Sequence, residues 1–464
     1  MSKQIQARWM FTLVFLALVN VALPQKRYEL TVKEAVELAF NNVTAVKNAA
    51  LDIQLQRAQN NEITGQALPQ VAGTASLNRY LQLPKILFPD ASQAGIYNVL
   101  IKEKILPANT PIPTPGLFAI SFFQPWNTSI GGTLSQLLFQ PDVFVGLQAR
   151  KTALNLSQAN LDLIKEGVKD SAYRRYYAIL IAQKQSEFLD SGIKRLQKLY
   201  HDDSIMLVNG FAERLDLDKV QVQLTNLQTS QSVLNNSIKL GYAGLKYSLG
   251  IYQNDTVILK EGLTNEDVKR DVLDNNFKYE DRKEIQAISY SRRLQELNVK
   301  RYKLGYIPTL SAFLSYTAQG QGKKFITDKN TFWLKNSLVG LNLSVPIFDG
   351  FQRKYKIQQE KFNLQKADNS VENLKRVIDL QQTASKESLK NALLNLDAQQ
   401  RNVQLAENVY NTTKKKFEAG VGSSFEVLQA DNDWQTAQSN YFTGLYNAII
   451  AKISYQSSLG KLDQ

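Results

Sequence analysis

Cysteine is absent from the 464-residue sequence, and histidine occurs only once, as His201. The absence of thiols excludes a disulfide framework, a thiolate metal site and a lipidated N-terminal cysteine. A single histidine excludes sites that need several histidine ligands. The adjacent Asp202 and Asp203 do not form a ligand pair with it, because neighbouring residues on a helix point in different directions. We therefore predict no metal, no other cofactor and no enzymatic activity.

Long apolar runs are also missing, apart from one at the N-terminus. There Lys3 and Arg8 precede an apolar run from Trp9 to Val21, and small residues follow. This order is typical of a secretory signal peptide, which we assign to residues 1–24. A membrane anchor is the alternative, but the run of about 13 residues is shorter than the roughly 20 that a spanning helix needs. An exported chain of this kind is periplasmic, secreted or a β-barrel.

Charge of one sign is not concentrated anywhere, although the formal net charge is +13. Lysine and arginine alternate with aspartate and glutamate, and no block of five or six like charges occurs. This distribution favours a solvated surface over a nucleic-acid interface.

Proline and glycine are scarce over one long stretch, since neither occurs between Gly350 and Gly420. A continuous helix from Phe351 to Ala419 would contain 69 residues and rise about 100 Å. Its apolar residues recur at three- and four-residue steps but form only a thin stripe. A helix of this kind needs other helices beside it, as in coiled coils.

The sequence contains an internal repeat. "GGTLSQLLFQPDV" at 131–143 aligns with "GLNLSVPIFDGF" at 340–351, and the glycine-containing segment 209–220 aligns with 419–430. Matched landmarks in one order indicate a duplication.

We assign three segments to the mature chain: a first structural repeat at residues 25–250, a linker at 251–280 and a second repeat at 281–464. In each repeat a helix leads to a proline, two strands with period-two alternation follow, and a long helical hairpin ends the unit.

The expected return strands are about Trp126–Phe139 and Trp333–Ile347. Seven prolines between Pro84 and Pro125 predict a long loop between the first two strands. Four strands cannot close a barrel, for which about eight are the minimum, and an open sheet is not viable in a bilayer. We therefore predict an oligomer that shares one barrel, with long helices that lead into the periplasm.

Five motifs resemble the TolC-like family of outer-membrane efflux proteins. They are "LTVKEAVELAFNN", "LGYIPTLSAFLSY", "LVGLNLSVPIFDGFQR", "VNGFAERLDLDKVQ" and "EAGVGSSFEVLQA", in the family's order. The resemblance implies an α+β membrane protein, a homotrimer whose 12-stranded β-barrel, four strands per chain, is continuous with a long α-helical barrel. It also implies location in the outer membrane of a Gram-negative bacterium, in contact with its lipid, and export of small molecules or polypeptides. The implied partners are a periplasmic adaptor and an inner-membrane pump.

The resemblance also places a periplasmic gate at the two hairpin tips. Asp216 and Glu426 match the acidic positions that follow the turn glycines, Gly210 and Gly420 match those glycines, and Phe417 matches an aromatic tip contact. The alternative for the two acids is a solvated helix face near a cap. Other gate positions depart from the family: Gln429 replaces a second acid, and Gly422 replaces an arginine.

We assign the barrel-to-tunnel joint to Pro346, Gly350 and, in the first repeat, Pro141, because proline ends a strand ladder and glycine permits a sharp turn. The alternative to a channel is a soluble periplasmic coiled-coil adaptor or scaffold. Two strand pairs with small and polar residues on one face and aromatic residues near their ends favour the channel.

Overall fold

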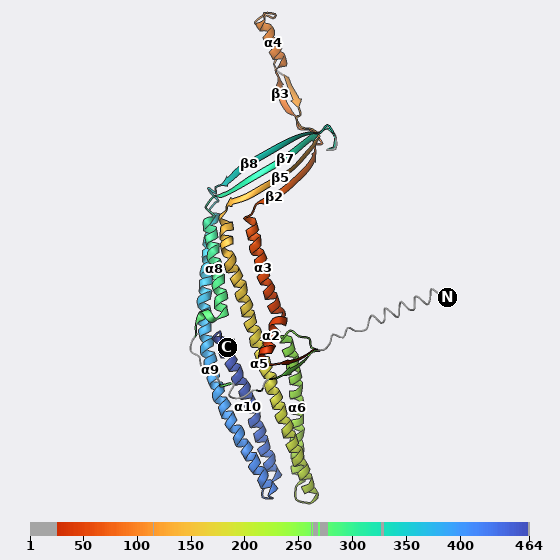
Figure 1. The fold of residues 1–464 in the computed structure, drawn as a ribbon, viewed down its shortest axis with the longest axis vertical. Coiled ribbons are helices and arrows are strands. Elements are labelled where there is room, and N and C mark those ends of the chain that lie inside the picture. The colour runs from red at the N-terminus through yellow and green to blue at the C-terminus, as the bar shows by residue number, and fades with distance from the viewer. Residues whose placement is uncertain are drawn as a thin grey trace, which may run out of the picture. The chain divides into compact units, whose positions relative to one another are not determined.

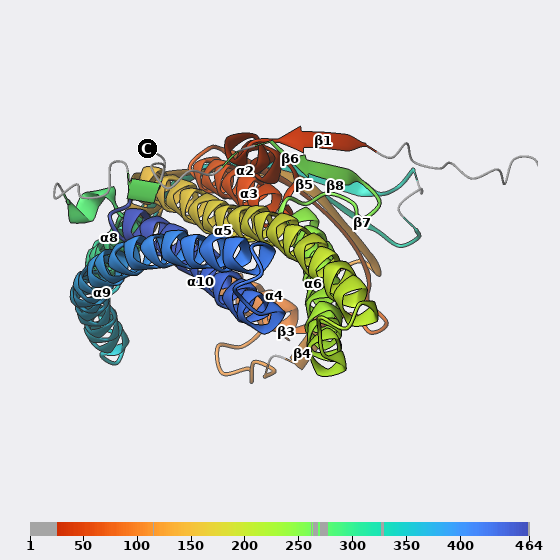
Figure 2. The ribbon, with the colours of Figure 1, turned by 90° about the horizontal axis from the view of Figure 1, so that it is seen from below.

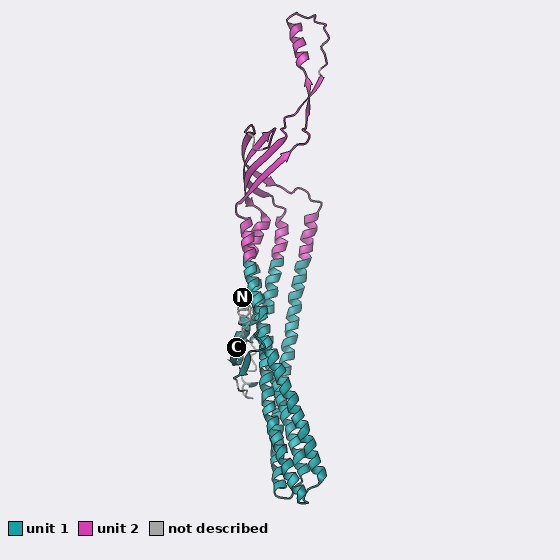
Figure 3. Ribbon diagram, turned by 90° about the vertical axis from the view of Figure 1, so that its right-hand side faces the viewer, with its two compact units in different colours: residues 1–57, 151–295, 362–464 teal, residues 58–150, 296–361 magenta. Residues whose placement is uncertain are grey.

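The computed structural model describes residues 26–114, 116–260, 262, 268–269, 277–325 and 329–462. The expected signal peptide lies outside the described residues, as does part of the expected linker, residues 261, 263–267 and 270–276. The chain forms two compact units (Figure 3). Unit 1 contains residues 1–57, 151–295 and 362–464, and unit 2 contains residues 58–150 and 296–361. Each unit therefore takes segments from both halves of the chain.

Unit 2 contains a four-stranded antiparallel sheet in the order β2-β5-β7-β8 (Figure 1). The strands are β2 (Gln70–Arg79), β5 (Trp126–Phe139), β7 (Thr309–Gly322) and β8 (Phe332–Ser344). β5 has the predicted bounds. β8 ends at Ser344 instead of Ile347, because Pro346 lacks the N–H that a ladder needs.

The proline-rich segment of unit 2 is not the long loop predicted from the sequence. It contains the paired strands β3 (Ile86–Asp90) and β4 (Gly116–Ile120) and the helix α4 (Ser92–Lys102). Pro89 lies within β3 opposite Leu117. A two-stranded ribbon tolerates proline, because each of its strands is an edge strand.

The long helices belong to two hairpins. One consists of α5 (Pro141–Val208) and α6 (Arg214–Ser248), and the other of α9 (Gln352–Glu418) and α10 (Ser424–Ser458). The unbroken helix predicted from Phe351 to Ala419 is confirmed by α9. The order of one helix region, two long strands and one long hairpin occurs twice along the chain.

The shorter helices precede the strands. A capping box between Thr31 and Glu34 starts α2 (Val32–Asn42), and after a break at Val43 the chain continues as α3 (Thr44–Gln66). The second helix region is α8 (Lys283–Leu304), which follows a single 3₁₀ turn, η1 (Tyr279–Asp281). None of the described helices combines the length and the apolar character that a membrane span requires.

The core of unit 1 is formed where helices pack on one another. The strands β1 (Arg27–Leu30) and β6 (Thr256–Leu259) pair in parallel beside α2. The fully buried Tyr176 of α5 donates a hydrogen bond from its hydroxyl to the Leu30 carbonyl oxygen at 3.0 Å. A second cluster joins the two hairpins through α5, α6, α9 and α10, which lie side by side (Figure 2).

Candidate functional site

The register of the unit 2 sheet gives it two chemically different faces. Residues that are directly opposite each other in an antiparallel pair share a face. One row that crosses all four strands is Val71, Leu134, Leu314 and Val339. The adjacent row on the other face is Ala72, Thr133, Ser315 and Leu338. Alternation along each strand therefore produces one face that is mainly apolar and one that is mainly polar.

Within the described residues, several large side chains of the apolar face are largely exposed. Val71 is 81% exposed, Val339 is 76% exposed and Leu341 is 69% exposed. The two outer strands, β2 and β8, each have only one hydrogen-bonded neighbour. The sheet thus presents both an uncovered apolar surface and two free edges.

The opposite face is polar and carries no ionisable side chain along its four strands. It includes Gln70, Thr74, Ser76, Asn78, Asn127, Ser129, Ser135, Ser311, Thr317 and Gln319. These four strands contain two basic residues, Arg79 and Lys335. Their register places both of them in rows of the apolar face. The polar face is therefore suited to contact with water.

The predicted joint residues lie between the strands and the long helices of unit 2. Pro141 is the first residue of α5, where its missing N–H costs nothing. Pro346 and Gly350 lie in the segment between β8 and α9. Gly350 and the following Phe351 both have positive φ, 63° and 66°. Two consecutive left-handed residues turn the chain sharply into α9.

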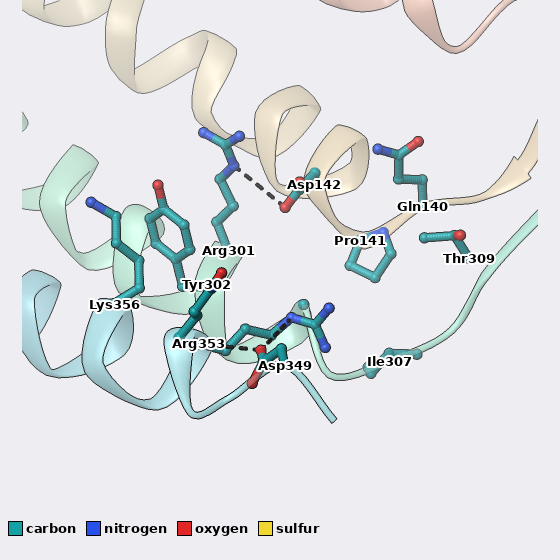
Figure 4. A pocket seen from close by; sticks show the side chains of 12 residues that line it. Gln140, Pro141, Asp142, Arg301, Tyr302, Ile307, Thr309, Asp349, Arg353 and Lys356 are labelled. Carbon is teal, nitrogen blue, oxygen red and sulfur yellow. Dashed lines mark hydrogen bonds and ion pairs between the residues drawn. The ribbon is translucent and has the colours of Figure 1, made fainter. Parts of the chain in front are cut away.

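A pocket of about 520 Å³ lies at this joint (Figure 4). Its charged side chains are Asp142, Arg301, Asp349, Arg353 and Lys356. The Arg301 Nε donates to Asp142 at 3.4 Å, and the Arg353 Nε lies 3.4 Å from Asp349. Asp349 also accepts a hydrogen bond from the Arg353 backbone N–H at 3.3 Å, which satisfies one of the free N–H groups in the first turn of α9.

The predicted turn glycines lie at the hairpin tips of unit 1. Gly210 has φ +76° and Gly420 has φ +75°, and a Cβ at either position would meet no atom within 4 Å. At the second tip, Val421 donates to the Lys416 carbonyl oxygen and Gly420 to that of Phe417. This is the bond pattern of a Schellman motif, and its left-handed residue favours glycine.

The two predicted gate acids occupy equivalent places but different surroundings. Asp216 lies in the first turn of α6, and its carboxylate pairs with Lys219 at 3.1 Å. Glu426 lies in the first turn of α10 and is exposed. The Lys219 ammonium lies 4.5 Å from the ring centre of Phe425, so a cation–π contact joins the tips of the two hairpins.

Phe417, the predicted aromatic tip contact, lies in the last turn of α9 next to the second hairpin tip. Its side chain is partly buried and packs on the apolar cluster between the hairpins, which includes Val220 and Val427. The Phe417 side chain therefore contributes to packing between the two hairpins of one chain.

Asp203 is a buried acid near the tips that sequence reasoning did not single out for burial. It is fully buried, and within the described part of the chain neither carboxylate oxygen has a hydrogen-bond partner of good geometry. Burial raises the pKa of Asp203, the Ser424 side chain opposes this shift, and the nearby Asp216 adds to it. The spacing of Leu196, Leu199 and Asp203 on one helix face is the signal that indicates its burial.

A second buried group, the Arg195 cluster, consists of Arg195, Asp431, Trp434, Tyr410 and Phe188. The Arg195 Nε donates to Asp431 at 2.7 Å, and the Asp431 side chain is only 1% exposed. The guanidinium carbon lies 4.2 Å from the Trp434 ring centre and about 5.5 Å from the other two rings. Arg195 and Asp431 are 236 residues apart. The sequence contains no local signal for their contact.

Comparison with known proteins identifies the fold. Residues 279–461 match the family model described as "Outer membrane efflux protein". The predicted likeness to TolC-like outer-membrane efflux proteins is confirmed. The outer membrane protein TolC of Vibrio cholerae is 18% identical over 72% of this chain and 77% of its own length. TolC of Escherichia coli is 17% identical, over 73% of this chain and 70% of its own length.

Solved structures of outer-membrane channels have the same fold. CusC has a TM-score of 0.72 at 14% identity, with 92% of each chain covered. The Neisseria gonorrhoeae channel MtrE, described in its open state, has a TM-score of 0.70 at 12% identity, with 93% of this chain and 89% of its own covered. These structures support the TolC-like fold. The expected outer-membrane location is supported by the family model and by the TolC relatives. The descriptions of the matched family and structures are those of an outer-membrane efflux protein and of outer-membrane channels. Within the described residues, no group of three potential metal-binding side chains occurs.

Proposed function

We propose that the protein is a trimeric outer-membrane channel-tunnel, the exit duct of a tripartite efflux or secretion system. The observation that carries the proposal is the sheet of unit 2, with its uncovered apolar face and its two free edge strands. In a bilayer each unpaired backbone group costs several kcal/mol, so the free edges of β2 and β8 need partner strands. Three copies of four strands supply those partners in a closed 12-stranded barrel.

The polarity of the two faces supports this arrangement. In a barrel the apolar face contacts lipid and the polar face lines a water-filled lumen. Residues such as Leu341 and Val339 would then face the acyl chains, and Ser315 and Thr317 would face water. A soluble adaptor, the alternative function, would leave the apolar face exposed to water at a cost of roughly 1.5–3 kcal/mol for each large side chain.

The helical hairpins provide the periplasmic part of the proposed duct. Their tips are the ends that an adaptor and an inner-membrane pump would meet. Glu426 is the stronger candidate for a charged ring at the tip, since it is exposed, whereas the carboxylate of Asp216 is paired with Lys219. Three copies of Glu426 would form a constriction that attracts cations.

Membrane fractionation and electrophoresis test the channel. We expect the protein in the outer-membrane fraction, a trimer that dissociates only on heating, and discrete conductance steps in planar bilayers. Recovery of the protein as a soluble periplasmic monomer would favour the adaptor instead.

Block of the channel by divalent cations tests the gate. Glu426→Ala is expected to weaken the block by several-fold, and Asp216→Ala to weaken it less, because Lys219 already offsets that charge. An unchanged block in the double variant would remove both residues from the gate and leave the channel itself intact.

A further inference from the structure

The joint pocket differs in charge from the polar face of the sheet. That face has no ionisable side chain, whereas the side chains that line the pocket include three basic and two acidic residues, a net charge of +1 in each chain.

The pocket lies on the side of the polar face. Thr309, which lines the pocket, is the first residue of β7 and alternates with Leu310 of the apolar face. Gln140, which also lines the pocket, directly follows the last residue of β5, Phe139. In the proposed duct the pocket thus opens toward the lumen, where a passing solute meets it.

Each of the two arginines of the pocket is paired with a carboxylate but keeps N–H donors that are not used in a hydrogen bond within the described residues. Each guanidinium lies with its Nε at a long distance of 3.4 Å from its carboxylate. Among the described residues, the structure shows no further hydrogen bond to their terminal nitrogens. Asp142 and Asp349 thus orient two guanidinium groups whose remaining donors are available, and such donors match the oxygen atoms of carboxylates, sulfonates and phosphates. Lys356 is less available, because it pairs with Glu360 at 3.1 Å.

The rest of the lining is suited to an organic molecule rather than to an inorganic ion. The Tyr302 ring lies 5.6 Å from the Arg301 guanidinium and 5.2 Å from the Lys356 ammonium. Pro141 and Ile307 add apolar surface (Figure 4). The volume of about 520 Å³ is in the range of sites for drug-sized ligands.

We propose that this pocket is a binding site for small organic anions on their way through the duct, with Arg301 and Arg353 as the residues that bind the anionic group. The proposal rests on the proposed channel function and adds a substrate class to it. It places charge recognition at the joint, in addition to the acids at the hairpin tips.

Block of single-channel current by 2-naphthoate tests the site. For the wild-type protein in planar bilayers we expect block by 2-naphthoate, and at least tenfold weaker block by 2-naphthylmethylammonium, which has the same ring and the opposite charge. Arg301→Gln combined with Arg353→Gln is expected to weaken the naphthoate block about tenfold, since each change removes hydrogen bonds to a charged group. Lys361→Gln is the matched control, because it removes a positive charge from an exposed position on α9 outside the pocket.

Three results would overturn the proposal: equal block in the wild-type protein and the double variant, equal loss of block in Lys361→Gln, or block by inorganic phosphate as strong as that by naphthoate. If the protein conducts normally and shows one of these results, the proposed channel function stands and the proposed anion site is refuted. A protein that forms no channel would refute the proposed function instead. Calorimetric binding of naphthoate to the detergent-solubilised protein then still tests the pocket, with binding expected in the wild type and about tenfold weaker binding in the double variant.

Discussion

The helical hairpins of unit 1 and the sheet of unit 2 differ in how far their apolar side chains are buried. In the hairpins, Leu196 is 1% exposed and Leu396 is fully buried. In the sheet, Val71 and Val339 remain more than three-quarters exposed. Both regions have regular apolar periodicity, of 3.6 residues in the helices and two in the strands. The hairpins therefore bury part of their apolar surface within one chain, although residues such as Leu240 and Leu380 stay exposed, whereas the apolar face of the sheet has its large side chains mostly exposed.

This difference shows where the chain depends on its surroundings. A buried aliphatic side chain contributes roughly 1.5–3 kcal/mol relative to an exposed one. The hairpins gain that contribution from contacts with each other. In the sheet it is available only from lipid or from another molecule, so the uncovered face is the strongest evidence for the environment of the protein.

The largest expected effect concerns the contact between the hairpins. Asp431→Ala leaves the largely buried Arg195 guanidinium without its carboxylate, and we expect a loss of about 3–5 kcal/mol in the free energy of opening the hairpins. Hydrogen exchange of the α5 and α10 amides measures this free energy. Asp433→Ala, which removes an exposed carboxylate from the same helix, is expected to change it by less than about 0.5 kcal/mol.

Replacing both Arg195 and Asp431 by apolar residues of similar volume tests whether the loss comes from the unpaired charge. Arg195→Met with Asp431→Leu is expected to restore much of the stability, because a buried ion pair is often replaceable by apolar residues of similar volume. Unchanged exchange in Asp431→Ala would show that the hairpins do not depend on the Arg195 cluster.

The next effect compares the two faces of the sheet at neighbouring positions of β8. Leu341→Lys places a charge on the apolar face and is expected to cost about 2–4 kcal/mol of stability in lipid bilayers if the position lies near the midplane. Asn342→Lys places the same charge on the other face, and we expect a much smaller cost. Urea unfolding in vesicles measures both. Equal costs would contradict the assignment of the faces.

The smallest effect concerns pH at the hairpin tips. The pKa of Asp203 is raised in the folded protein, mainly by burial. The protonated form is thus favoured in the folded state, and its contribution to stability is lost as the pH rises through the folded pKa. Asp203→Asn should therefore stabilise the tips at neutral pH, and the gain should vanish below the usual pKa of aspartate, about 4. Hydrogen exchange near Ser424 measures this, with Asp202→Asn as the control, and a gain independent of pH would refute the explanation.

Much of the fold could be predicted from local sequence. The bounds of β5 and the unbroken helix α9 follow from alternation and from the absence of proline and glycine. The strands β3 and β4 were missed because prolines mask two short apolar runs. The break at Val43 was missed because no proline or glycine marks it.

The candidate sites were less predictable, because they depend on contacts between distant segments. The joint pocket combines three segments that are far apart in the sequence. The Arg195 cluster likewise joins α5 to α9 and α10. The turn glycines have a local signal, whereas the pairing of Asp216 with Lys219 depends on rotamers that a pattern of residues does not determine.

The orientation of the sheet in the membrane can be measured directly, because the sequence contains no cysteine. Single cysteines introduced one at a time from Leu338 to Leu343 of β8 are labelled with a nitroxide in the reconstituted protein, and the access of oxygen and of a water-soluble nickel complex is compared. The account predicts alternation with a period of two: oxygen access dominates at Val339, Leu341 and Leu343, and nickel access dominates at the positions between them. Uniform access of the nickel complex at all six positions would contradict it.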